Sequence, residues 1–340
     1  PWFEVVDIAA SENSANKSYK NAVQSKWVMD DPIPENIKNL NLRSVENFNS
    51  IPKEVKIVFS AVDLSDKEKT RMFEFKYAKK GYAVISTSSA NRESDDVPML
   101  IPEINHEHLD ILKVQQKNHH LPNSGFVVVK PNCSIQSYIF VLDALKKANY
   151  PIDKVQVTTL QALSGAGYQA LSNTKFKNNV VPFINGEEEK TEAEPTKIFG
   201  AIKGNKIINN VNLKINATCT RVPIIDGHTA VVSISFSKNK PSIIDFKEIL
   251  RSYISLPQNL NLPSAPIKPI HILDDKDRPQ PKLDLKNDKG MALSIGRIQK
   301  DLFFDLRFVG LSHNTLRGAA GGAILNAELL VEKDYISSKN

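Results

Sequence analysis

Apolar runs and amphipathic segments alternate along the first 130 residues. Short runs rich in Val, Ile and Phe occupy residues 3–9, 55–62, 82–86 and 126–129, and runs of this kind are typical of buried strands. Between them, Ser65 and Glu68 form a capping box that opens a helix ending at Gly81, and residues 106–117 have helical spacing. Strand–helix–strand units of this length predict a parallel sheet with right-handed crossovers.

After residue 150 the pattern changes to long alternating segments. They predict strands over 154–163, 211–222, 229–237 and 303–311, as in a mixed or antiparallel sheet. The Asp226-Gly227 pair predicts a hairpin that joins 222–225 to 229–233. Residues 256–281 are rich in proline and predict an extended surface segment.

This change of pattern predicts two domains, which also suits a chain of 340 residues. The fold class is α/β: a Rossmann-like domain with a parallel sheet over 1–132, and an α+β domain with a mixed or antiparallel sheet over 133–314. The first half of the helix expected from Thr315 consists of small residues, Gly318 to Ala323. Residues 315–340 are therefore expected to pack closely back on the first domain.

Composition and charge narrow the functional class. Two cysteines exclude a disulfide framework, and no apolar run approaches the ~18 residues of a membrane span. The net charge of +6 comes from lysines spread along the chain, without the arginine and aromatic clusters of single-strand binders, so we expect no nucleic-acid partner. No secretory signal is visible, which predicts a cytoplasmic protein with no membrane partner.

Cys133 is a candidate nucleophile. It lies where a buried strand ends and an amphipathic helix over 135–149 begins, and the N–H groups and dipole of a helix start stabilise a thiolate. The alternative is a small buried hydrophobe, which the alternating pattern around Cys219 predicts for that residue. His228 follows a turn at the start of a strand, where it either forms a base for the thiol or simply ends the strand.

Other polar segments are weaker signals. The small residues of 161–167 form a turn that lets backbone approach a ligand, and Arg92 follows a strand at a sheet edge where anions bind. The run Glu187 to Lys190 is typical of a solvated face. Glu194 and Lys197, three residues apart, would share a helix face as a surface ion pair worth ~0.3–0.5 kcal/mol. No spacing indicates a metal site.

Taken together, these segments resemble the aspartate-semialdehyde dehydrogenase family, in its archaeal and fungal branch, over nearly the whole chain. The order and spacing of the motifs carry the resemblance more than any one of them. They are Asp96-Val-Pro-Met-Leu-Ile-Pro-Glu-Ile-Asn105, Pro131-Asn-Cys-Ser134, Thr159-Leu-Gln-Ala-Leu-Ser-Gly-Ala-Gly167, Gly186-Glu-Glu-Glu-Lys190, Glu194-Pro-Thr-Lys197, Arg221-Val-Pro-Ile-Ile-Asp-Gly-His228, Asp277-Arg-Pro-Gln-Pro281 and Ser312-His-Asn-Thr-Leu-Arg-Gly-Ala-Ala-Gly-Gly322.

The resemblance implies NADPH-dependent reductive dephosphorylation of β-aspartyl phosphate to aspartate 4-semialdehyde, in lysine, threonine and methionine biosynthesis. It places the nucleophile at Cys133, the acid–base histidine at His228 and an orienting amide at Gln161. The backbone around Asn132 and Cys133 would then be an oxyanion site. A homodimer or homotetramer is implied.

The same resemblance assigns the binding residues. Arg221 matches the α-carboxylate ligand, Glu194 the α-amino ligand, and Arg92 and Lys197 the phosphate ligands. On the NADP side, the matching residues are Ser11, Ser14, Lys17, Ser164, Gly165, Gly167 and Asn314. A 2′-phosphate fits the first three because the strand before them ends without the acidic residue that binds a ribose hydroxyl in NAD enzymes.

The sequence departs from the family pattern at one place, and two alternative functions are considered. The family opens with a strand and a glycine-rich pyrophosphate loop, and the sequence beginning at Pro1 is expected to lack that loop. A malonyl- or succinyl-CoA reductase resembles the same family but has no α-amino group for Glu194 to bind. A non-catalytic paralogue that lost its cofactor loop is the alternative from another class, although every catalytic position downstream is present.

Overall fold

The structure, a computed structural model, describes residues 2–29, 31–62 and 66–337. In its first part the strands are β1 (Ala9–Ala10), β2 (Arg43–Ser44), β3 (Ile57–Ser60), β4 (Ala83–Ser86) and β5 (Phe126–Val129). The helices there are α1 (Tyr19–Val23), α2 (Glu35–Lys38), α3 (Lys67–Lys79) and α4 (Leu112–Asn118), with 3-10 turns η1 (Phe48–Ser50) and η2 (His106–Ile111). No helix within the described ranges is long and apolar enough to cross a membrane.

The first sheet is parallel, in the order β3-β4-β5, and its strands β4 and β5 are buried on both faces. Because side chains alternate along a strand, Val84 and Val127 pack with Phe75 of α3, whereas Ile85 and Val128 pack with the last helix of the chain. Continuous apolar runs are the pattern expected of such strands. The predicted α/β fold is confirmed here.

Two expectations for this part need correction. Of the strand predicted over 3–9, only β1 forms, paired in parallel with β2 in a separate two-stranded sheet. Ser65, predicted to cap α3, lies outside the described residues, and the carboxylate of Asp66 accepts hydrogen bonds from the backbone N–H groups of Glu68 and Lys69 instead. The helix ends as predicted before Gly81, whose φ of +92° suits glycine.

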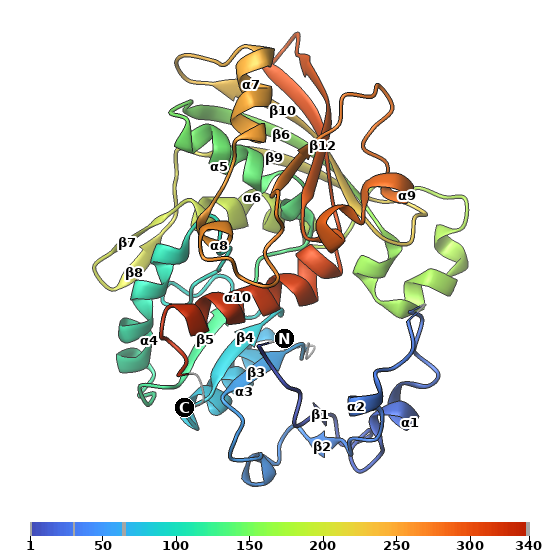
Figure 1. The fold of residues 1–340 in the computed structure, drawn as a ribbon, viewed down its shortest axis with the longest axis vertical. Helices are drawn as coiled ribbons and strands as arrows, with labels where there is room; N and C mark the ends of the chain where they lie inside the picture. Colours follow the sequence, from blue (N-terminus) through green and yellow to red (C-terminus); the bar gives the residue numbers. More distant parts are fainter. Residues whose placement is uncertain (1, 30, 63–65, 338–340) are drawn as a thin grey trace.

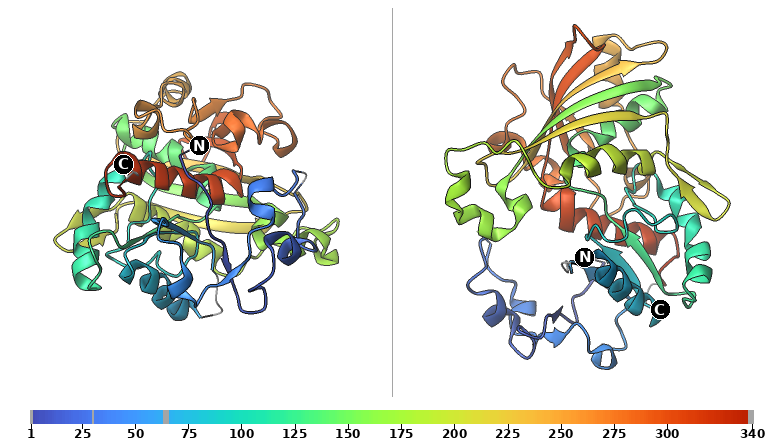
Figure 2. Two further views of the ribbon diagram at one scale, coloured as in Figure 1. Left: turned by 60° about the horizontal axis from the view of Figure 1, so that its bottom comes forward. Right: turned by 180° about the vertical axis from the view of Figure 1, so that it is seen from behind.

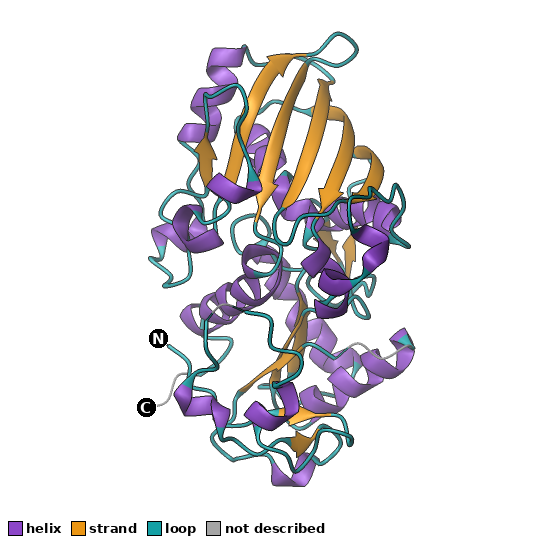
Figure 3. Ribbon diagram, turned by 90° about the vertical axis from the view of Figure 1, so that its right-hand side faces the viewer, coloured by secondary structure: helices purple, strands orange, loops and turns teal. Residues whose placement is uncertain are grey.

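The second part is built on a six-stranded sheet in the order β11-β12-β13-β10-β6-β9 (Figure 3). Its strands are β6 (Ile152–Gln161), β9 (Lys214–Arg221), β10 (His228–Phe236), β11 (Ile270–Ile272), β12 (Leu293–Lys300) and β13 (Leu306–Ser312), and β7 (Ala201–Lys203) with β8 (Lys206–Ile208) forms a small hairpin. The helices are α5 (Ile139–Lys147), α6 (Glu187–Ile198), α7 (Ile243–Arg251), α8 (Leu256–Asn259) and α9 (Pro281–Asp284), with shorter turns η3 (Ser134–Ser137), η4 (Leu163–Ala166), η5 (Tyr168–Ser172), η6 (Thr174–Phe176) and η7 (Asn287–Gly290).

The hairpin predicted at Asp226-Gly227 is wrong. β6 lies between β9 and β10, parallel to the first and antiparallel to the second, so the two do not pair. Residues 222–225 instead cross the end of β6, where the backbone N–H groups of Leu163 and Ser164 donate to the carbonyls of Ile224 and Ile225 at 2.8 and 3.1 Å. A local turn signal cannot report a strand that is inserted from elsewhere in the chain.

Two other predicted segments differ in detail. The proline-rich stretch 256–281 is not wholly a surface segment, because it contains α8 and β11, which pairs in parallel with β12, and it buries Pro257 and Leu262. The helix predicted over 135–149 is interrupted: η3 comes first, and α5 begins at Ile139 after Tyr138, whose φ of −148° is not helical.

The last helix joins the two sheets. It begins as a π-helical turn, η8 (Leu316–Ala320), continues as α10 (Gly321–Glu332), and lies between the two sheets (Figures 1 and 2). Its apolar side chains, among them Leu325 and Leu329, pack with Ile85 and Phe126 of the first sheet. The ends of both sheets therefore meet around one helix.

Candidate active site

Three strands of the large sheet bring side chains to one edge. β6 ends at Gln161 and β9 at Arg221, which are register partners, while the antiparallel β10 begins at His228 beside them. Cys133 reaches the same place from the loop that follows β5. The arrangement follows from topology, because parallel strands end at the same edge of a sheet and an antiparallel neighbour starts there.

Cys133 and His228 are in contact. Sγ of Cys133 lies 3.3 Å from Nε2 of His228, and it is 3.4 Å from Oδ1 of Asn132, to which the thiol donates. Cys133 is partly exposed, whereas His228 is fully buried. Cys219, as expected for a core residue, is completely buried in β9.

The proton of His228 can be placed from its partners. The backbone N–H of Ala162 donates to Nδ1 at 3.1 Å, and because an N–H can only donate, Nδ1 carries no proton. A neutral ring then carries its proton on Nε2, facing the sulfur. Burial, followed by the charge of Arg221, lowers the pKa of His228 to about 3, so the ring stays neutral. In this geometry Nε2 is a donor to the sulfur.

The expectation that a helix start lowers the pKa of the thiol needs correction. Burial and then the carboxylate of Glu187 raise the pKa of Cys133, against the lowering effect of Lys130, Arg92 and Arg221. The helix that would stabilise the thiolate is also absent, because Cys133 is followed by only the short turn η3. The surrounding charges, not a helix dipole, decide whether the thiolate forms.

Glu187 belongs to the site, although its charge run predicted a solvated face. Its Oε2 accepts from Nδ2 of Asn132 at 2.8 Å and from Nε2 of Gln161 at 3.1 Å, while Oε1 pairs with Lys190 at 2.9 Å. Burial would raise the pKa of Glu187, but the bond and charge of Lys190 outweigh it and lower that pKa.

Glu194 is buried between two partners rather than in a surface ion pair. Oε1 pairs with Nη1 of Arg92 at 2.8 Å, and Oε2 accepts from the backbone N–H of Asn132 at 2.5 Å. The N–H of Asn132 is therefore occupied, which corrects the expectation that it contributes to an oxyanion site. Nε of Arg92 is buried and has no hydrogen-bond partner among the described residues. An orphaned guanidinium donor of this kind suits an anion.

Lys197 lies on the same face of α6, but its ammonium group is fully engaged. Nζ donates to the carbonyls of Arg92, Ser94 and Val97 at 2.7, 2.6 and 2.9 Å. Burial lowers the pKa of Lys197 to about 8. In this arrangement Lys197 holds the loop that carries Arg92.

Arg221 and Gly165 lie next to each other and to His228. Nη1 of Arg221 donates to the carbonyl of Ala162 at 2.6 Å, and burial lowers its pKa. A Cβ at Gly165 would lie 3.0 Å from Nη1 of Arg221 and 3.0 Å from Cε1 of His228. Only glycine lets the backbone pass this close to both side chains.

The residues expected on the cofactor side fall into two groups. Nδ2 of Asn314 donates to Oγ of Ser164 at 2.7 Å, its Oδ1 accepts from the N–H of Gly227 at 2.8 Å, and Gly167, with a φ of +84°, has open space around it. This group adjoins Cys133. Ser11, Ser14 and Lys17 lie apart, in the loop after β1.

The loop after β1 adjoins a cavity of about 750 Å³. Glu12, Asn16, Arg43 and Ser44 contribute to its lining, and Glu12 accepts a hydrogen bond from Ser44. Arg43 is paired with Asp7 at 2.8 Å. In the described part of the chain, no group of three His, Cys, Asp or Glu side chains could hold a metal ion.

The sequence matches two domain families. The family described as "Semialdehyde dehydrogenase, NAD binding domain" matches residues 1–112, and "Semialdehyde dehydrogenase, dimerisation domain" matches residues 142–317. Among curated proteins, the aspartate-semialdehyde dehydrogenase of Schizosaccharomyces pombe is 39% identical over 98% of this chain and 92% of its own length. That of Archaeoglobus fulgidus is 39% identical over 99% and 93%.

A solved structure shares the whole fold. The aspartate-semialdehyde dehydrogenase of Candida albicans, crystallised with NADP, superposes with a TM-score of 0.86 at 36% identity, covering 99% of this chain and 93% of that one. The second such enzyme of Vibrio cholerae, at 23% identity and a TM-score of 0.73, has the same fold.

Proposed function

The chain belongs to the aspartate-semialdehyde dehydrogenase family, and on this premise we propose that it converts β-aspartyl phosphate to aspartate 4-semialdehyde with NADPH. The observation that carries the proposal is the contact of 3.3 Å between Sγ of Cys133 and Nε2 of His228. Ion pairs of Glu187 with Lys190 and of Glu194 with Arg92 lie in the same site. A partly exposed thiol beside a fixed N–H donor suits acyl transfer through a thioester.

The acyl-transfer step uses groups of this chain. Sγ attacks the acyl carbon, the bond from that carbon to the phosphate oxygen breaks, and the leaving phosphate takes the thiol proton. The Nε2–H of His228 faces the sulfur, so it also lies beside the oxygen of the carbon under attack and stabilises the charge that develops there. Gln161 and Asn132, both held by Glu187, border the same space.

NADPH, when bound, supplies the hydride that reduces the thioester. The residues that would hold its nicotinamide end are Ser164, Gly165, Gly167 and Asn314, because Gly165 lets the backbone pass close to His228 and Gly167 has open space around it. The adenosine 2′-phosphate would meet Ser11, Ser14 and Lys17. Glu12, the acidic residue that could favour NAD, accepts a hydrogen bond from Ser44, and Lys17 supplies the one positive charge of that loop.

Substrate binding follows from the charges at the site. Arg221 commits one N–H to Ala162, and its fork suits the α-carboxylate. Glu194 accepts the α-amino group, and the Nε of Arg92, orphaned among the described residues, is a free donor for the phosphate. Lys197 acts on the phosphate through Arg92, whose carbonyl it holds.

We propose the same domain division as the sequence pattern: residues 1–132 for the cofactor, 133–314 for catalysis and subunit contacts, and 315–340 returning to the first. The dimerisation-domain match supports an oligomer, which we propose to be a homodimer or homotetramer in the cytoplasm.

The assay that tests this function is oxidation of aspartate semialdehyde by the full-length protein. The rate should depend on both phosphate and NADP⁺, because phosphate releases the acyl group from sulfur. A protein that instead reduces malonyl-CoA or succinyl-CoA, and ignores aspartate semialdehyde, would refute the proposal.

Glu194→Gln should lower kcat/KM for aspartate semialdehyde by about 10- to 100-fold. A hydrogen bond between a carboxylate and the substrate ammonium is worth about 1.5–3 kcal/mol, and the amide removes the charge. Glu189→Gln, an exposed carboxylate of the same helix, is the matched control and should leave the rate unchanged. Equal rates for both variants would show that Glu194 does not bind the amino group of the substrate.

Glu187→Gln should change two measurements in opposite directions. Since the Glu187 carboxylate raises the pKa of Cys133, its loss should lower that pKa and speed alkylation of the thiol by iodoacetamide at neutral pH. The rate of the enzymatic reaction should fall about tenfold, because the amides of Asn132 and Gln161 lose a charged acceptor worth about 1.5–3 kcal/mol. If both rates fell together, the carboxylate would not control the thiol.

Lys17→Ala should weaken binding of NADP by about tenfold and leave binding of NAD unchanged, since a charged hydrogen bond to a phosphate is worth about 1.5–3 kcal/mol. Calorimetric titration of both dinucleotides into the full-length protein measures this. The same loss for both cofactors would place Lys17 away from the 2′-phosphate.

A further inference from the structure

Lys130 is a buried lysine for which the reaction described above has no role. It directly follows β5, three residues before Cys133, and its exposed fraction is 3%. The hydrogen bond that its Nζ donates to the carbonyl of Pro131 is long, at 3.5 Å. Good N–H···O bonds measure about 2.7–3.2 Å, so the amine is poorly satisfied for a group withdrawn from water.

The last helix fixes Lys130 beside the nucleophile. A Cβ at Gly318 would lie 2.7 Å from Cβ of Cys133, and one at Gly322 would lie 2.4 Å from Cε of Lys130. The two glycines are four residues apart, so they occupy neighbouring turns on one helix face, about 5–6 Å from each other. The stem of Lys130 and the side chain of Cys133 therefore rest on adjacent turns of the same helix.

Two of the other cations nearby already have counter-ions. Arg317 forms a two-pronged pair with Glu103 at 2.6 and 2.7 Å, and Arg92 pairs with Glu194. Among the described residues, no carboxylate forms an ion pair with Lys130. Burial and then Arg317 lower the pKa of Lys130 to about 7, with Arg92 acting in the same direction and Cys133 and Glu194 opposing it.

We propose that Lys130 is the counter-charge of the Cys133 thiolate. In the resting pair the sulfur holds its proton, and at neutral pH a fraction of Lys130 is the neutral amine that can accept it. When the S–H bond breaks and an N–H bond forms, thiol and amine become thiolate and ammonium with no change in total charge. Once the thioester has formed, the ammonium gives up this proton, which ends on the leaving phosphate. Both new charges lie in a poorly solvated place, where opposite charges attract more strongly than in water. Lys130 thus acts on the reaction through the sulfur, as a positioning residue.

This inference rests on Cys133 being the nucleophile, but its test needs no substrate. Alkylation of Cys133 by iodoacetamide, a neutral reagent, is followed against pH in a Cys219→Ala background, so that one thiol reacts. Lys130→Met should shift the midpoint of the profile upward by about one pH unit and slow alkylation at pH 7 about tenfold, because the thiolate is the reactive form. Glu187→Gln should shift the midpoint downward.

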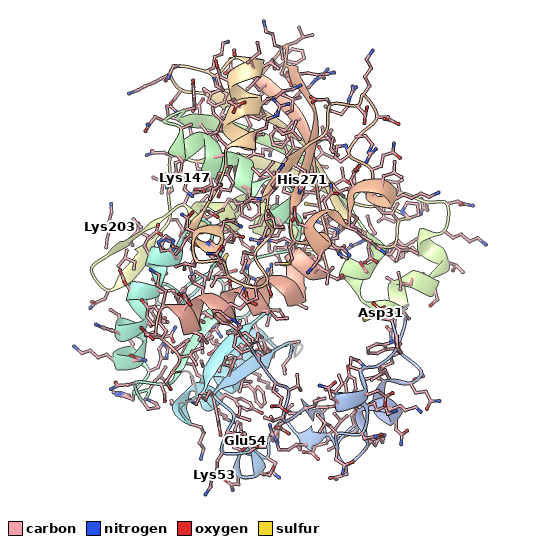
Figure 4. All side chains as sticks on the ribbon, in the orientation of Figure 1. Asp31, Lys53, Glu54, Lys147, Lys203 and His271 are labelled. Atoms are coloured by element: carbon pink, nitrogen blue, oxygen red, sulfur yellow. The ribbon has the colours of Figure 1, made fainter. Side chains whose placement is uncertain are left out.

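Lys53→Met is the matched control, since it removes the same charge elsewhere. Lys53 is exposed and precedes β3, at the amino end of the parallel strands, whereas Cys133 follows their carboxyl end (Figure 4). Its profile should match that of the parent. A Lys130→Met profile equal to that of Lys53→Met would overturn the proposal.

Methionine matches the length of lysine and suits a buried apolar place, so Lys130→Met should fold; its thermal unfolding shows whether it does. If it does not, linkage offers a second measurement, because coupling between two groups is reciprocal. In protein with ¹³C-labelled lysine, the ammonium form of Lys130 should persist to higher pH with Cys133 present than in Cys133→Ala. Identical titrations would overturn the proposal. An enzyme without activity on aspartate semialdehyde, but with the shifted alkylation profile, would refute the proposed function alone.

Discussion

Replacing Cys133 by alanine is expected to abolish the phosphate-dependent oxidation of aspartate semialdehyde, with a loss of at least about a thousandfold in kcat. The thioester needs a sulfur at that place. Within the described residues the other thiol, Cys219, is fully buried in β9, where its Sγ contacts Oγ1 of Thr191 at 3.6 Å. It has no path to a substrate.

Cys219→Ala is the matched control and should keep the activity of the parent. Mass spectrometry of the protein mixed with acyl phosphate and no cofactor should detect an acyl group on Cys133. A Cys133→Ala variant with ordinary turnover, or an acyl group found on another residue, would contradict covalent catalysis by this thiol.

The buried parallel sheet was predictable because its strands are continuous apolar runs. β4 and β5 are buried on both faces, and strands of this kind are continuous runs of hydrophobic residues that can be recognised in the sequence. The connection from Arg221 to His228 was not predictable in the same way. Its turn residues are those of a hairpin, but β6, more than 50 residues earlier in the chain, occupies the position between the two strands.

The residues of the site also differ in how far the sequence predicts them. Cys133 and His228 were identifiable from their places at the ends of strands, and the structure brings them into contact. Glu187 and Lys130 were not, because a carboxylate in an acidic run and a lysine after a strand usually face water. The roles of Glu187 and Lys130 depend on which charged groups are paired in the folded chain. These pairs join residues that are distant in sequence, such as Arg317 and Glu103, so the sequence does not reveal them.

Burial and the surrounding charges also explain why the expected sign of the thiol pKa was wrong. Helix starts favour thiolates, but η3 is a short turn, and burial followed by the carboxylate of Glu187 raises the pKa of Cys133. Formation of the thiolate therefore depends on cations that come from three different segments, Arg92, Lys130 and Arg221. A change in any of these should alter reactivity without touching the sulfur.

His228 gives the second large effect, and three substitutions separate its possible roles. His228→Gln keeps an N–H donor the same number of bonds from Cα as Nε2 but is not a base. His228→Asn keeps an acceptor near the place of Nδ1 for the N–H of Ala162 and loses the donor to sulfur. His228→Leu loses both.

If Nε2–H is a donor, as the hydrogen bond from the backbone N–H of Ala162 to Nδ1 requires, His228→Gln should retain kcat/KM within about tenfold of the parent. The asparagine and leucine variants should lose about 100- to 1000-fold, the usual cost of removing one oxyanion donor. A glutamine variant as inactive as the leucine variant would show that the ring must accept a proton.

The pH dependence tests the same assignment. Burial lowers the pKa of His228 to about 3, below its ordinary value of about 6.5 in the unfolded chain, so between these values the unfolded state binds the additional proton. The contribution of His228 to stability is therefore present above about pH 6.5 and is lost as the pH falls toward 3. Over pH 5–8 kcat/KM should show no titration from this imidazole, and the parent and His228→Gln should have profiles of the same shape. A limb near pH 6.5 that disappears in the glutamine variant would show that His228 is protonated during the reaction, and the donor assignment would then be wrong.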